Sequence, residues 1–326
     1  MKAISLFSGG LDSQLAVCLI KEQGVEAVGV HFKTPFFGDG PYVAEAARQL
    51  GITLLVVDVS QDYIDVLKNP RYGYGKHMNP CTDCHGFMLS RAGRIMEEIG
   101  ARFIITGEVL GQRPKSQTKA ALRQVEKLSG YAGYILRPLS AKLLPPTIPE
   151  QEGWVDRERL LDISGRSRLP QMELADKYGL RDYPSPAGGC LLTQENFARR
   201  LRRLLQAYPD AGAEDMHILR YGRHFYLSET TLLVVGRNRE ENAELSRLAR
   251  YSDYLLKVKT HPGPVGLLRP FSNSDQEELA SAAAIVARYS DAKDCNVVSV
   301  KITQPGGNEV EMTVRPLAPS ATPSSV

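Results

Sequence analysis

Residues 6–17 (LFSGGLDSQLAV) place two glycines and small polar side chains between an apolar run and a second run with helical spacing. Gly9 and Gly10 can take positive φ angles and turn backbone N–H groups toward an anion, which the helix dipole also attracts. Asp12 can hold Mg²⁺ or brace the loop. Because the lysine of a Walker A loop is missing, we expect pyrophosphate to leave and an acceptor oxygen to be adenylated. The expected ATP-binding residues of this loop are Ser8, Gly9, Gly10, Leu11, Asp12 and Ser13.

Three of the five cysteines are spaced as parts of one site. Cys81 and Cys84 lie in NPCTDCH, before a segment with helical spacing, and Cys190 lies in SPAGGCLLT. The first turn of a helix brings the sulfur atoms of a CxxC pair to one side, where they can share a metal ion. An odd number of cysteines in a large chain without a signal peptide favours metal binding or catalysis over disulfides. Zinc held by these cysteines and His85, or a redox pair at the helix N-terminus, are alternatives.

The segment 106–117 (TGEVLGQRPKSQ) carries flexible glycines and hydrogen-bond donors directly after an expected strand. Its cations Arg113 and Lys115 can meet ATP phosphates or an RNA backbone, and a solvated basic loop is the alternative. The end of the second expected strand is a usual place for contacts to adenine. Residues expected to bind ATP in these two places are Phe32, Lys33, Gly107 and Gln112.

Short β-rich runs alternate with segments whose apolar residues have helical spacing. The runs are 2–6, 25–32, 53–58 and 102–106, and the helical segments are 13–22, 42–50 and 85–99. This rhythm predicts βαβ units in an α/β fold with a doubly wound parallel sheet. Ligands of such sheets bind at the carboxyl ends of the strands, so the loops after the first and fourth strands should carry the chemistry.

The composition and the expected secondary structure change along the chain, which predicts four parts. Residues 1–145 form the nucleotide-binding domain, and a proline-rich stretch ends it. Residues 146–210 form a mainly helical segment that carries Cys190. Residues 211–315 form a smaller α+β domain, and the tail at 316–326 is expected to be disordered because it is small, polar and proline-containing.

The loop at residues 8–13, placed between a first strand and a helix, resembles the PP-loop of the ATP pyrophosphatase superfamily. This superfamily includes GMP synthetase, argininosuccinate synthetase, NAD synthetase and the tRNA thiolation enzymes. The resemblance implies an adenine nucleotide alpha-hydrolase-like fold, ATP and Mg²⁺ as ligands, and a catalytic role for Asp12.

Three further stretches resemble tRNA thiolation enzymes. Residues 106–117 and 137–139 (RPL) resemble stretches of 4-thiouridine synthetases, and residues 188–190 resemble the GxC element of tRNA 2-thiouridylases. In the latter, the GxC cysteine works with one near the start of the helix, which implies catalytic roles for Cys84 and Cys190. The extra cysteine resembles the three-cysteine thiolases, in which a 4Fe–4S cluster keeps one iron open to sulfide. The residues implied as cluster ligands are Cys81, Cys84 and Cys190.

Two stretches indicate contact with RNA. Residues 198–205 (ARRLRRLL) carry four arginines on an expected helix, where they form either a solvated face or a surface for RNA phosphates. Residues 217–302 resemble the NFACT-R RNA-binding module through LLVVGRNREENAELSRLA, and depart from it at 253–256 (DYLL), where that family has D-W-x-H. The candidate RNA-binding residues are Arg113, Lys115, Arg199, Arg200, Arg202, Arg203, Arg237 and Asn238.

The composition and net charge limit the classes of protein to which the chain can belong. A hydrophobic fraction of 43% and a charged fraction of 24% are typical of globular proteins, and a net charge of +3 is too small to predict a nucleic-acid partner by itself. No run approaches the roughly 18 apolar residues of a membrane span, and the first residues enter a strand without a signal peptide. We therefore expect a cytoplasmic protein with no membrane partner.

Together these patterns and resemblances predict an ATP-dependent tRNA sulfurtransferase that adenylates a uridine carbonyl oxygen and replaces it with sulfur. The expected partners are tRNA, a sulfur donor (sulfide, or a cysteine desulfurase or persulfide carrier), and a second copy of the chain in a homodimer. Two alternatives stay open: a small-molecule PP-loop ligase or nitrile synthase with zinc-binding cysteines, and a non-catalytic RNA-binding factor that holds ATP.

Overall fold

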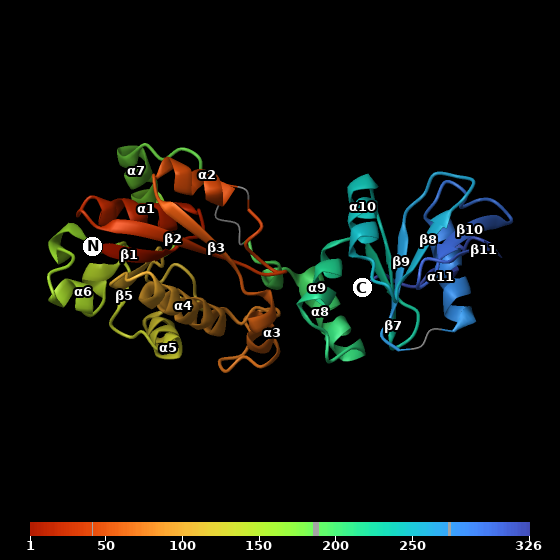
Figure 1. The fold of residues 1–326 in the computed structure, drawn as a ribbon, viewed down its shortest axis with the longest axis horizontal. Coiled ribbons are helices and arrows are strands. Elements are labelled where there is room, and N and C mark those ends of the chain that lie inside the picture. Colours follow the sequence, from red (N-terminus) through yellow and green to blue (C-terminus); the bar gives the residue numbers. More distant parts are fainter. Residues whose placement is uncertain (41, 185–188, 273–274) are drawn as a thin grey trace. The chain divides into compact units, whose positions relative to one another are not determined.

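A computed structural model describes residues 1–40, 42–184, 189–272 and 275–326 of the chain. The chain divides into two units, Met1–Thr193 and Gln194–Val326, each with its own sheet and core (Figure 1). Residues 146–193 thus lie in the first unit, and the four-part division predicted from the sequence stays a prediction. Gly188, which belongs to the predicted GxC element, lies outside the described residues.

The first unit is built on a sheet of five parallel strands in the order β3-β2-β1-β4-β5. The strands are β1 (Lys2–Leu6), β2 (Glu26–Lys33), β3 (Thr53–Asp58), β4 (Phe103–Thr106) and β5 (Ile135–Leu136). The chain leaves β1 toward β2 on one side and later returns to place β4 on its other side. The loops after β1 and β4 therefore diverge at the switch point of the sheet, where α/β proteins bind ligands.

Helices cover both faces of this sheet, because successive strand residues point to opposite sides. Ala3 of β1 belongs to the core under α1, α2 and α7, whereas Ile4 belongs to the core under α4 and α5. The ribbon shows these two helical layers, with the strands between them (Figure 1). The helices are α1 (Leu11–Lys21), α2 (Tyr42–Gln49), α3 (Ser60–Lys68), α4 (Cys81–Glu98), α5 (Lys119–Ser129), α6 (Ile148–Gln151) and α7 (Leu169–Tyr178). The predicted doubly wound α/β fold is confirmed.

The second unit is an antiparallel sheet in the order β11-β10-β8-β9-β7-β6, with α11 packed on the core. Its strands are β6 (Arg223–Tyr226), β7 (Thr231–Val235), β8 (Tyr254–Val258), β9 (Gly266–Pro270), β10 (Val298–Thr303) and β11 (Glu309–Val314). Its helices are α8 (Glu195–Ala207), α9 (Ala213–Met216), α10 (Arg239–Leu248) and α11 (Gln276–Arg288). The predicted smaller α+β module is confirmed in this unit.

The end of the chain makes contacts within the second unit. A 3₁₀ turn spans Pro319–Ala321, and the Val326 amide donates to the His224 carbonyl oxygen at 3.0 Å. The sequence predicted disorder for this tail, whereas here its last residue is tied to β6. Among the described residues, no helix has both the length and the apolar character needed to cross a membrane.

Candidate active site

The loop at residues 8–13 forms a small, internally bonded turn between β1 and α1. Gly9 takes φ +73°, a left-handed value that favours glycine, while Gly10 at φ −74° precedes the first residue of α1. The Ser13 hydroxyl donates to the Gly10 carbonyl oxygen at 2.8 Å, and the Gly10 amide donates to the Ser8 hydroxyl at 3.3 Å. Gln14 adds a bond from its side-chain amide to the Gly9 carbonyl oxygen at 2.8 Å. The loop is therefore held in shape by its own side chains.

Asp12 joins this loop to the one after β4. Its Oδ2 accepts from the Gln112 side-chain amide at 3.2 Å. Burial raises the pKa of the Asp12 carboxyl, while hydrogen bonds from Gln112 and Gln171 and the charges of Arg168 and Arg113 act to lower it. Carboxylate oxygens are the ligands that Mg²⁺ prefers, so the chemistry of Asp12 beside an anion-binding loop fits that ion.

Gly107 shows how closely the two loops approach. A Cβ atom added at Gly107 would lie 2.5 Å from both the Asp12 carbonyl carbon and the Ser13 amide nitrogen. Only glycine fits between these two main-chain segments. The structure thus brings together Gly107, Gln112 and the loop at residues 8–13, all of which the sequence predicted as ATP ligands.

The two ATP candidates at the end of β2 lie in different surroundings. The Phe32 ring is buried in the core under α4 and α5, and Lys33 lies 3.8 Å from the Asp39 carboxylate with both side chains partly exposed. Their neighbour His31 contacts the carbonyl oxygens of Phe7 at 2.9 Å and Gly38 at 3.0 Å through its two ring nitrogens. The contact of Phe32 and Lys33 with adenine stays a prediction.

The three cysteines predicted as one site gather at the start of α4. Cys81 is the first residue of the helix, Cys84 is buried one turn later, and Cys190 belongs to a segment that donates from Leu191 to the Phe36 carbonyl oxygen at 2.9 Å. Burial raises the pKa of Cys84 well above its ordinary value, and the nearby Cys190 and Cys81 raise it further. Burial likewise raises the pKa of Cys190 to about 11. The Phe36 ring packs on Tyr63, whose hydroxyl bonds to Cys84, so the segment of Cys190 lies beside the start of α4.

The donor set of the site is sulfur, which suits iron–sulfur clusters and zinc. Across the described parts of the chain, however, no three His, Cys, Asp or Glu side chains converge in the arrangement that holds a metal ion. The other two cysteines pack elsewhere, with Cys18 against the core of the first unit and Cys295 against that of the second. The thiols of Cys81, Cys84 and Cys190 are gathered, and a metal or cluster on them is a proposal.

His85, the alternative zinc ligand, belongs to a buried ion network. Its Nδ1 contacts Glu108 Oε1 at 2.8 Å, and Arg137 donates to Glu108 Oε2 at 3.0 Å. Burial acts to raise the pKa of Glu108, but Arg137 and His85 outweigh it and lower that pKa to about 2. Arg137 also pairs with Glu126 of α5. The network joins α4 to the ends of β4 and β5, and sequence reasoning missed it although both Glu108 and Arg137 lie in its quoted motifs.

Arg113 and Lys115 follow Gln112 in the loop after β4, and both side chains are exposed. The charge of Arg113 acts to lower the pKa of Asp12 and that of Cys190. The Lys115 carbonyl oxygen accepts from the Thr82 hydroxyl of α4 at 3.4 Å. The Lys115 ammonium donates to the Tyr72 carbonyl oxygen, also at 3.4 Å. The loop after β4 therefore contacts the ATP candidates on one side and the cysteine helix on the other.

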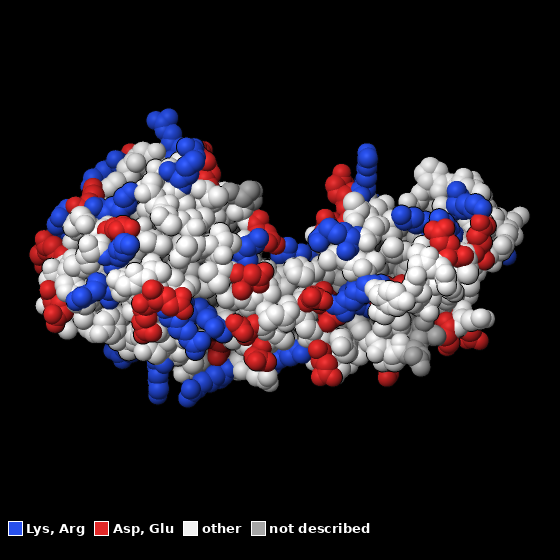
Figure 2. Space-filling model, in the orientation of Figure 1, with Lys and Arg blue, Asp and Glu red and all other residues white. Residues whose placement is uncertain are grey.

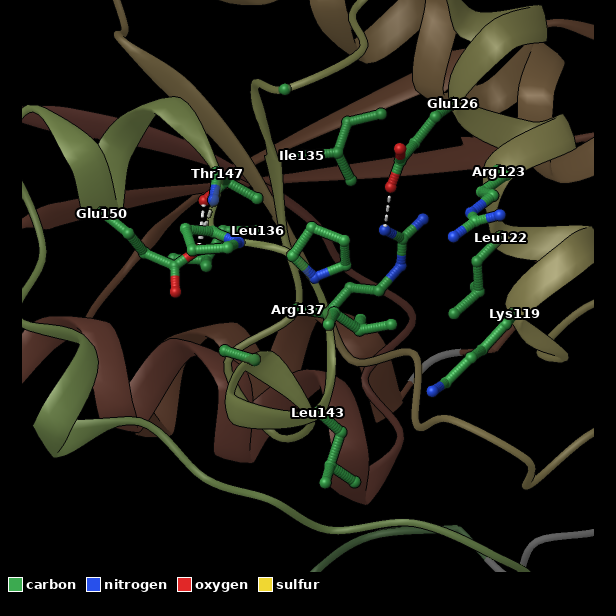
Figure 3. A pocket seen from close by; sticks show the side chains of 15 residues that line it. Lys119, Leu122, Arg123, Glu126, Ile135, Leu136, Arg137, Leu143, Thr147 and Glu150 are labelled. Atoms are coloured by element: carbon green, nitrogen blue, oxygen red, sulfur yellow. Dashed lines mark hydrogen bonds and ion pairs between the residues drawn. The ribbon is translucent and has the colours of Figure 1, made fainter.

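A separate pocket of the first unit contains none of the predicted ATP or cysteine residues. Figure 3 shows Arg137 and its bond to Glu126 between Lys119 of α5 and the turn at Leu143. Thr147 and Glu150 close the other side with a reciprocal helix cap. Since Arg137 is tied to Glu108 and Glu126, this hollow lies behind the ion network and away from the nucleotide loop.

The arginines of α8 divide into two pairs. Arg200 donates to the carbonyl oxygens of Leu219 at 2.9 Å, Gly222 at 3.0 Å and Val326 at 3.3 Å, so its guanidinium is occupied inside the second unit. Arg203 is half-buried and lies 4.2 Å over the Tyr226 ring. Two predicted RNA contacts remain fully available to solvent on this helix, namely Arg199 and Arg202.

The other RNA candidates of this unit stabilise the start of α10. Asn238 caps the helix by accepting from the Glu241 amide at 2.9 Å, and Arg237 pairs with the Glu241 carboxylate. On the face drawn in Figure 2, Lys and Arg are interspersed with Asp and Glu over each unit. Neither unit has a large surface of one charge on that face, in agreement with the small net charge of +3.

The structure defines a parallel α/β unit with a glycine loop after β1, followed by an α+β unit, and two family models match parts of these units. Residues 1–142 match the family described as thiamine biosynthesis protein (ThiI), and residues 222–324 match the NFACT protein RNA binding domain. The predicted resemblances to PP-loop tRNA thiolation enzymes and to the NFACT-R module are confirmed.

Curated relatives match about half of the chain. A tRNA-specific 2-thiouridylase MnmA from Pelobacter propionicus is 29% identical over 188 residues, which is 54% of this chain and 52% of the relative. A probable tRNA sulfurtransferase from Thermococcus kodakarensis is 30% identical over 189 residues, which is 53% of this chain and 44% of the relative. The chain spans about half the length of these curated relatives.

Among solved structures, a 4-thiouridine synthetase in complex with RNA and with bound ATP is similar to this chain. The sequence identity is 20% and the TM-score 0.39, over 67% of this chain and 52% of that one.

Proposed function

We propose that this chain is an ATP-dependent tRNA sulfurtransferase, which adenylates a uridine carbonyl oxygen and replaces that oxygen with sulfur. The observation that carries the proposal is the loop after β4. It bonds to Asp12 of the nucleotide loop through Gln112, and it bonds to α4, which begins at Cys81, through Lys115 and Glu108. An anion-binding loop and a group of thiols at one edge of a parallel sheet suit a reaction that uses ATP and sulfur in succession. The printed names of the relatives, a 2-thiouridylase and a tRNA sulfurtransferase, point to the same reaction.

The first step is assigned to the loops after β1 and β4. The uridine oxygen attacks the α-phosphorus of ATP, the bond to the β-phosphate oxygen breaks, and pyrophosphate leaves. The turn around Gly9 and the N-terminus of α1 offer amide donors to the departing charge. Asp12 would hold Mg²⁺, which neutralises phosphate charge when bound. Gln112 keeps the Asp12 carboxylate in place through its 3.2 Å bond.

The second step is assigned to the cysteines. A sulfur nucleophile attacks the activated carbon, and AMP leaves with the oxygen. Three neighbouring thiols are the ligand set of a 4Fe–4S cluster with one open iron, so Cys81, Cys84 and Cys190 would hold such a cluster, which supplies a place for sulfide when bound. Without iron, one of Cys84 and Cys190 would receive a persulfide from a cysteine desulfurase or another carrier, and its outer sulfur would attack the activated carbon. The other thiolate would then break the S–S bond and leave a Cys84–Cys190 disulfide, which an external thiol reduces before the next turnover.

We assign tRNA binding to both units. In the second unit, which matches an RNA-binding domain, the exposed Arg199 and Arg202 would meet phosphates. In the first unit, Arg113 and Lys115 are exposed beside the site where the uridine must react. Phosphate contacts of this kind fix the position of an RNA without reading its sequence.

Nucleoside mass spectrometry of bulk tRNA from cells with and without the gene tests the proposed reaction. We expect a thiouridine to disappear without the gene, to return with the wild-type chain or the Cys18→Ser control, and to stay absent with Cys84→Ser or Cys190→Ser. An unchanged thiouridine profile, or formation of ADP and orthophosphate instead of AMP and pyrophosphate from labelled ATP, contradicts the proposal. Anaerobic purification with assays of iron, acid-labile sulfide and zinc then separates cluster, persulfide and zinc chemistry.

A further inference from the structure

The sulfur atom of Cys81 has a hydrogen-bond donor fixed beside it. The Asn79 side-chain amide donates to Cys81 Sγ at 3.1 Å, and Asn79 Oδ1 accepts from the His77 amide at 3.1 Å. Asn79 is buried, and its side chain lies against Gly75, where an added Cβ would come within 2.3 Å of the Asn79 amide nitrogen. The contacts of the loop therefore hold the Asn79 side-chain amide in one orientation, with an N–H group directed at the Cys81 sulfur.

Tyr63 of α3 provides a donor to Cys84. Its side chain is 1% exposed, and its hydroxyl is hydrogen-bonded to the Cys84 sulfur. The ring is packed among Phe36, Phe37 and Phe87, with centroid distances of 5.9, 5.4 and 5.9 Å. A ring held on several sides cannot swing its hydroxyl to another acceptor without repacking the cluster.

The same aromatic cluster connects Tyr63 to the third cysteine. The Phe36 carbonyl oxygen accepts from the Leu191 amide at 2.9 Å, which holds the residue after Cys190 next to a ring that Tyr63 packs against. The side-chain donors to Cys81 and Cys84 therefore come from two separate segments of the chain, and a third segment carries Cys190 to the same aromatic cluster.

A neutral thiol is a weak acceptor, so a buried tyrosine or asparagine gains little by bonding to one. A thiolate, a persulfide anion or a cluster sulfur is a much stronger acceptor, because hydrogen bonds to charged groups are roughly twice as strong as neutral ones. Fixed donors of this kind orient the sulfur atoms that they contact, as the groups around a metal site orient its ligands.

We propose that Tyr63 and Asn79 are positioning residues of the sulfur site, which hold the Cys84 and Cys81 sulfur atoms in a fixed orientation. The proposal rests on the proposed function for the use of this sulfur, and on the contacts of Tyr63 and Asn79 for everything else. Because the two donors act on different cysteines from different segments, each can be removed without touching the other.

Cobalt(II) is a direct probe, since its bonds to thiolates give a charge-transfer band in the near ultraviolet. The reduced, metal-free full chain is titrated with Co²⁺ and compared with Tyr63→Phe, Asn79→Asp and a control. Loss of a residue that orients a metal ligand typically weakens metal affinity by about 10–100-fold, and we expect this for both variants. Tyr178→Phe is the control because its hydroxyl donates to Glu22, at 2.8 Å, on the other helical layer. It should bind Co²⁺ like the wild type.

Cobalt affinities of Tyr63→Phe and Asn79→Asp within twofold of the wild type would overturn the proposal. So would a wild-type chain that gives no charge-transfer band, because the three sulfur atoms would then not act together. ATP–pyrophosphate exchange is measured on the same variants with tRNA and Mg²⁺ present and should stay within threefold, since neither residue touches the nucleotide loop. A parallel loss of exchange and cobalt affinity would assign the residues to general stability instead. If cobalt affinity falls as expected while cellular thiouridine is unchanged by gene deletion, this inference stands and the proposed function fails.

Discussion

Gly107→Ala is the sharpest test of how the two ATP loops depend on each other. The new Cβ would lie 2.5 Å from the Asp12 carbonyl carbon and the Ser13 amide nitrogen, and 2.6 Å from the Asp12 carbonyl oxygen. These neighbours are main chain, so no side chain can rotate away. Reaching an ordinary contact of 3.4 Å requires the loops to separate by about 0.9 Å.

The size of this displacement sets two expected effects. A misplacement of about 1 Å in a catalytic arrangement costs roughly 100-fold in rate, so ATP–pyrophosphate exchange in the presence of tRNA should fall about 100-fold. Overpacking of this kind costs about 1–3 kcal/mol of unfolding free energy, and each kcal/mol lowers the melting temperature of a domain of this size by about 2–4 °C. The unit should therefore melt lower by roughly 2–12 °C and still fold.

Gly212→Ala serves as the matched control. Gly212 has φ −98°, which alanine adopts freely, and the nearest atom to its added Cβ is 3.9 Å away. Exchange by this variant should equal that of the wild type. Exchange by Gly107→Ala within threefold of the wild type would refute the reasoning, because the loops could then separate at no cost to the reaction.

Three further predictions concern charge. Glu108→Gln should destabilise the first unit by about 3 kcal/mol, because it leaves the buried Arg137 with a weaker partner. Since the pKa of Glu108 is lowered from 4.5 to about 2, its stabilisation is complete above pH 4.5 and is lost as the pH falls toward 2, so wild-type but not variant melting temperatures should show this loss. Burial lowers the pKa of His224 from 6.5 to about 3, so His224 takes up a proton on unfolding at pH values below 6.5. The unfolding free energy of the second unit should therefore fall by about 2 kcal/mol between pH 7 and pH 5. Calorimetry of His224→Gln should show no such fall. Arg199→Ala and Arg202→Ala should each reduce the salt dependence of tRNA binding by about one unit of slope in filter-binding assays, and an unchanged slope contradicts the assigned contact.

The fold of the first unit follows from local patterns in the sequence. Four β-rich runs appear as β1 to β4, because buried parallel strands need continuous apolar residues that stand out against polar neighbours. The strand β5 was missed since Ile135–Leu136 is too short to show a period. The helix α3 was also missed, although Tyr63, Ile64 and Leu67 are buried with the spacing of one helical face.

The candidate site was predicted where its chemistry is local and missed where it depends on packing. The glycine loop and the CxxC pair are contiguous, so their residue types alone indicate what they can bind. The partners of Glu108 are 23 and 29 residues away in the chain, and no pattern within the sequence pairs them. Tyr63 was missed for the same reason. A tyrosine in α3 reaches Cys84 of α4 only after the two helices have packed together.

The arrangement of strands explains why the two predicted steps can share one edge. The strands β1 and β4 are adjacent and parallel, so the loops that follow them leave the sheet side by side at the switch point. The second of these loops carries Glu108, which holds His85, and His85 follows Cys84 at the start of α4. One loop therefore contacts Asp12 through Gln112 and positions the cysteine helix through Glu108. A displacement of that loop should disturb ATP chemistry and sulfur chemistry together, which independent domains for the two steps would not do.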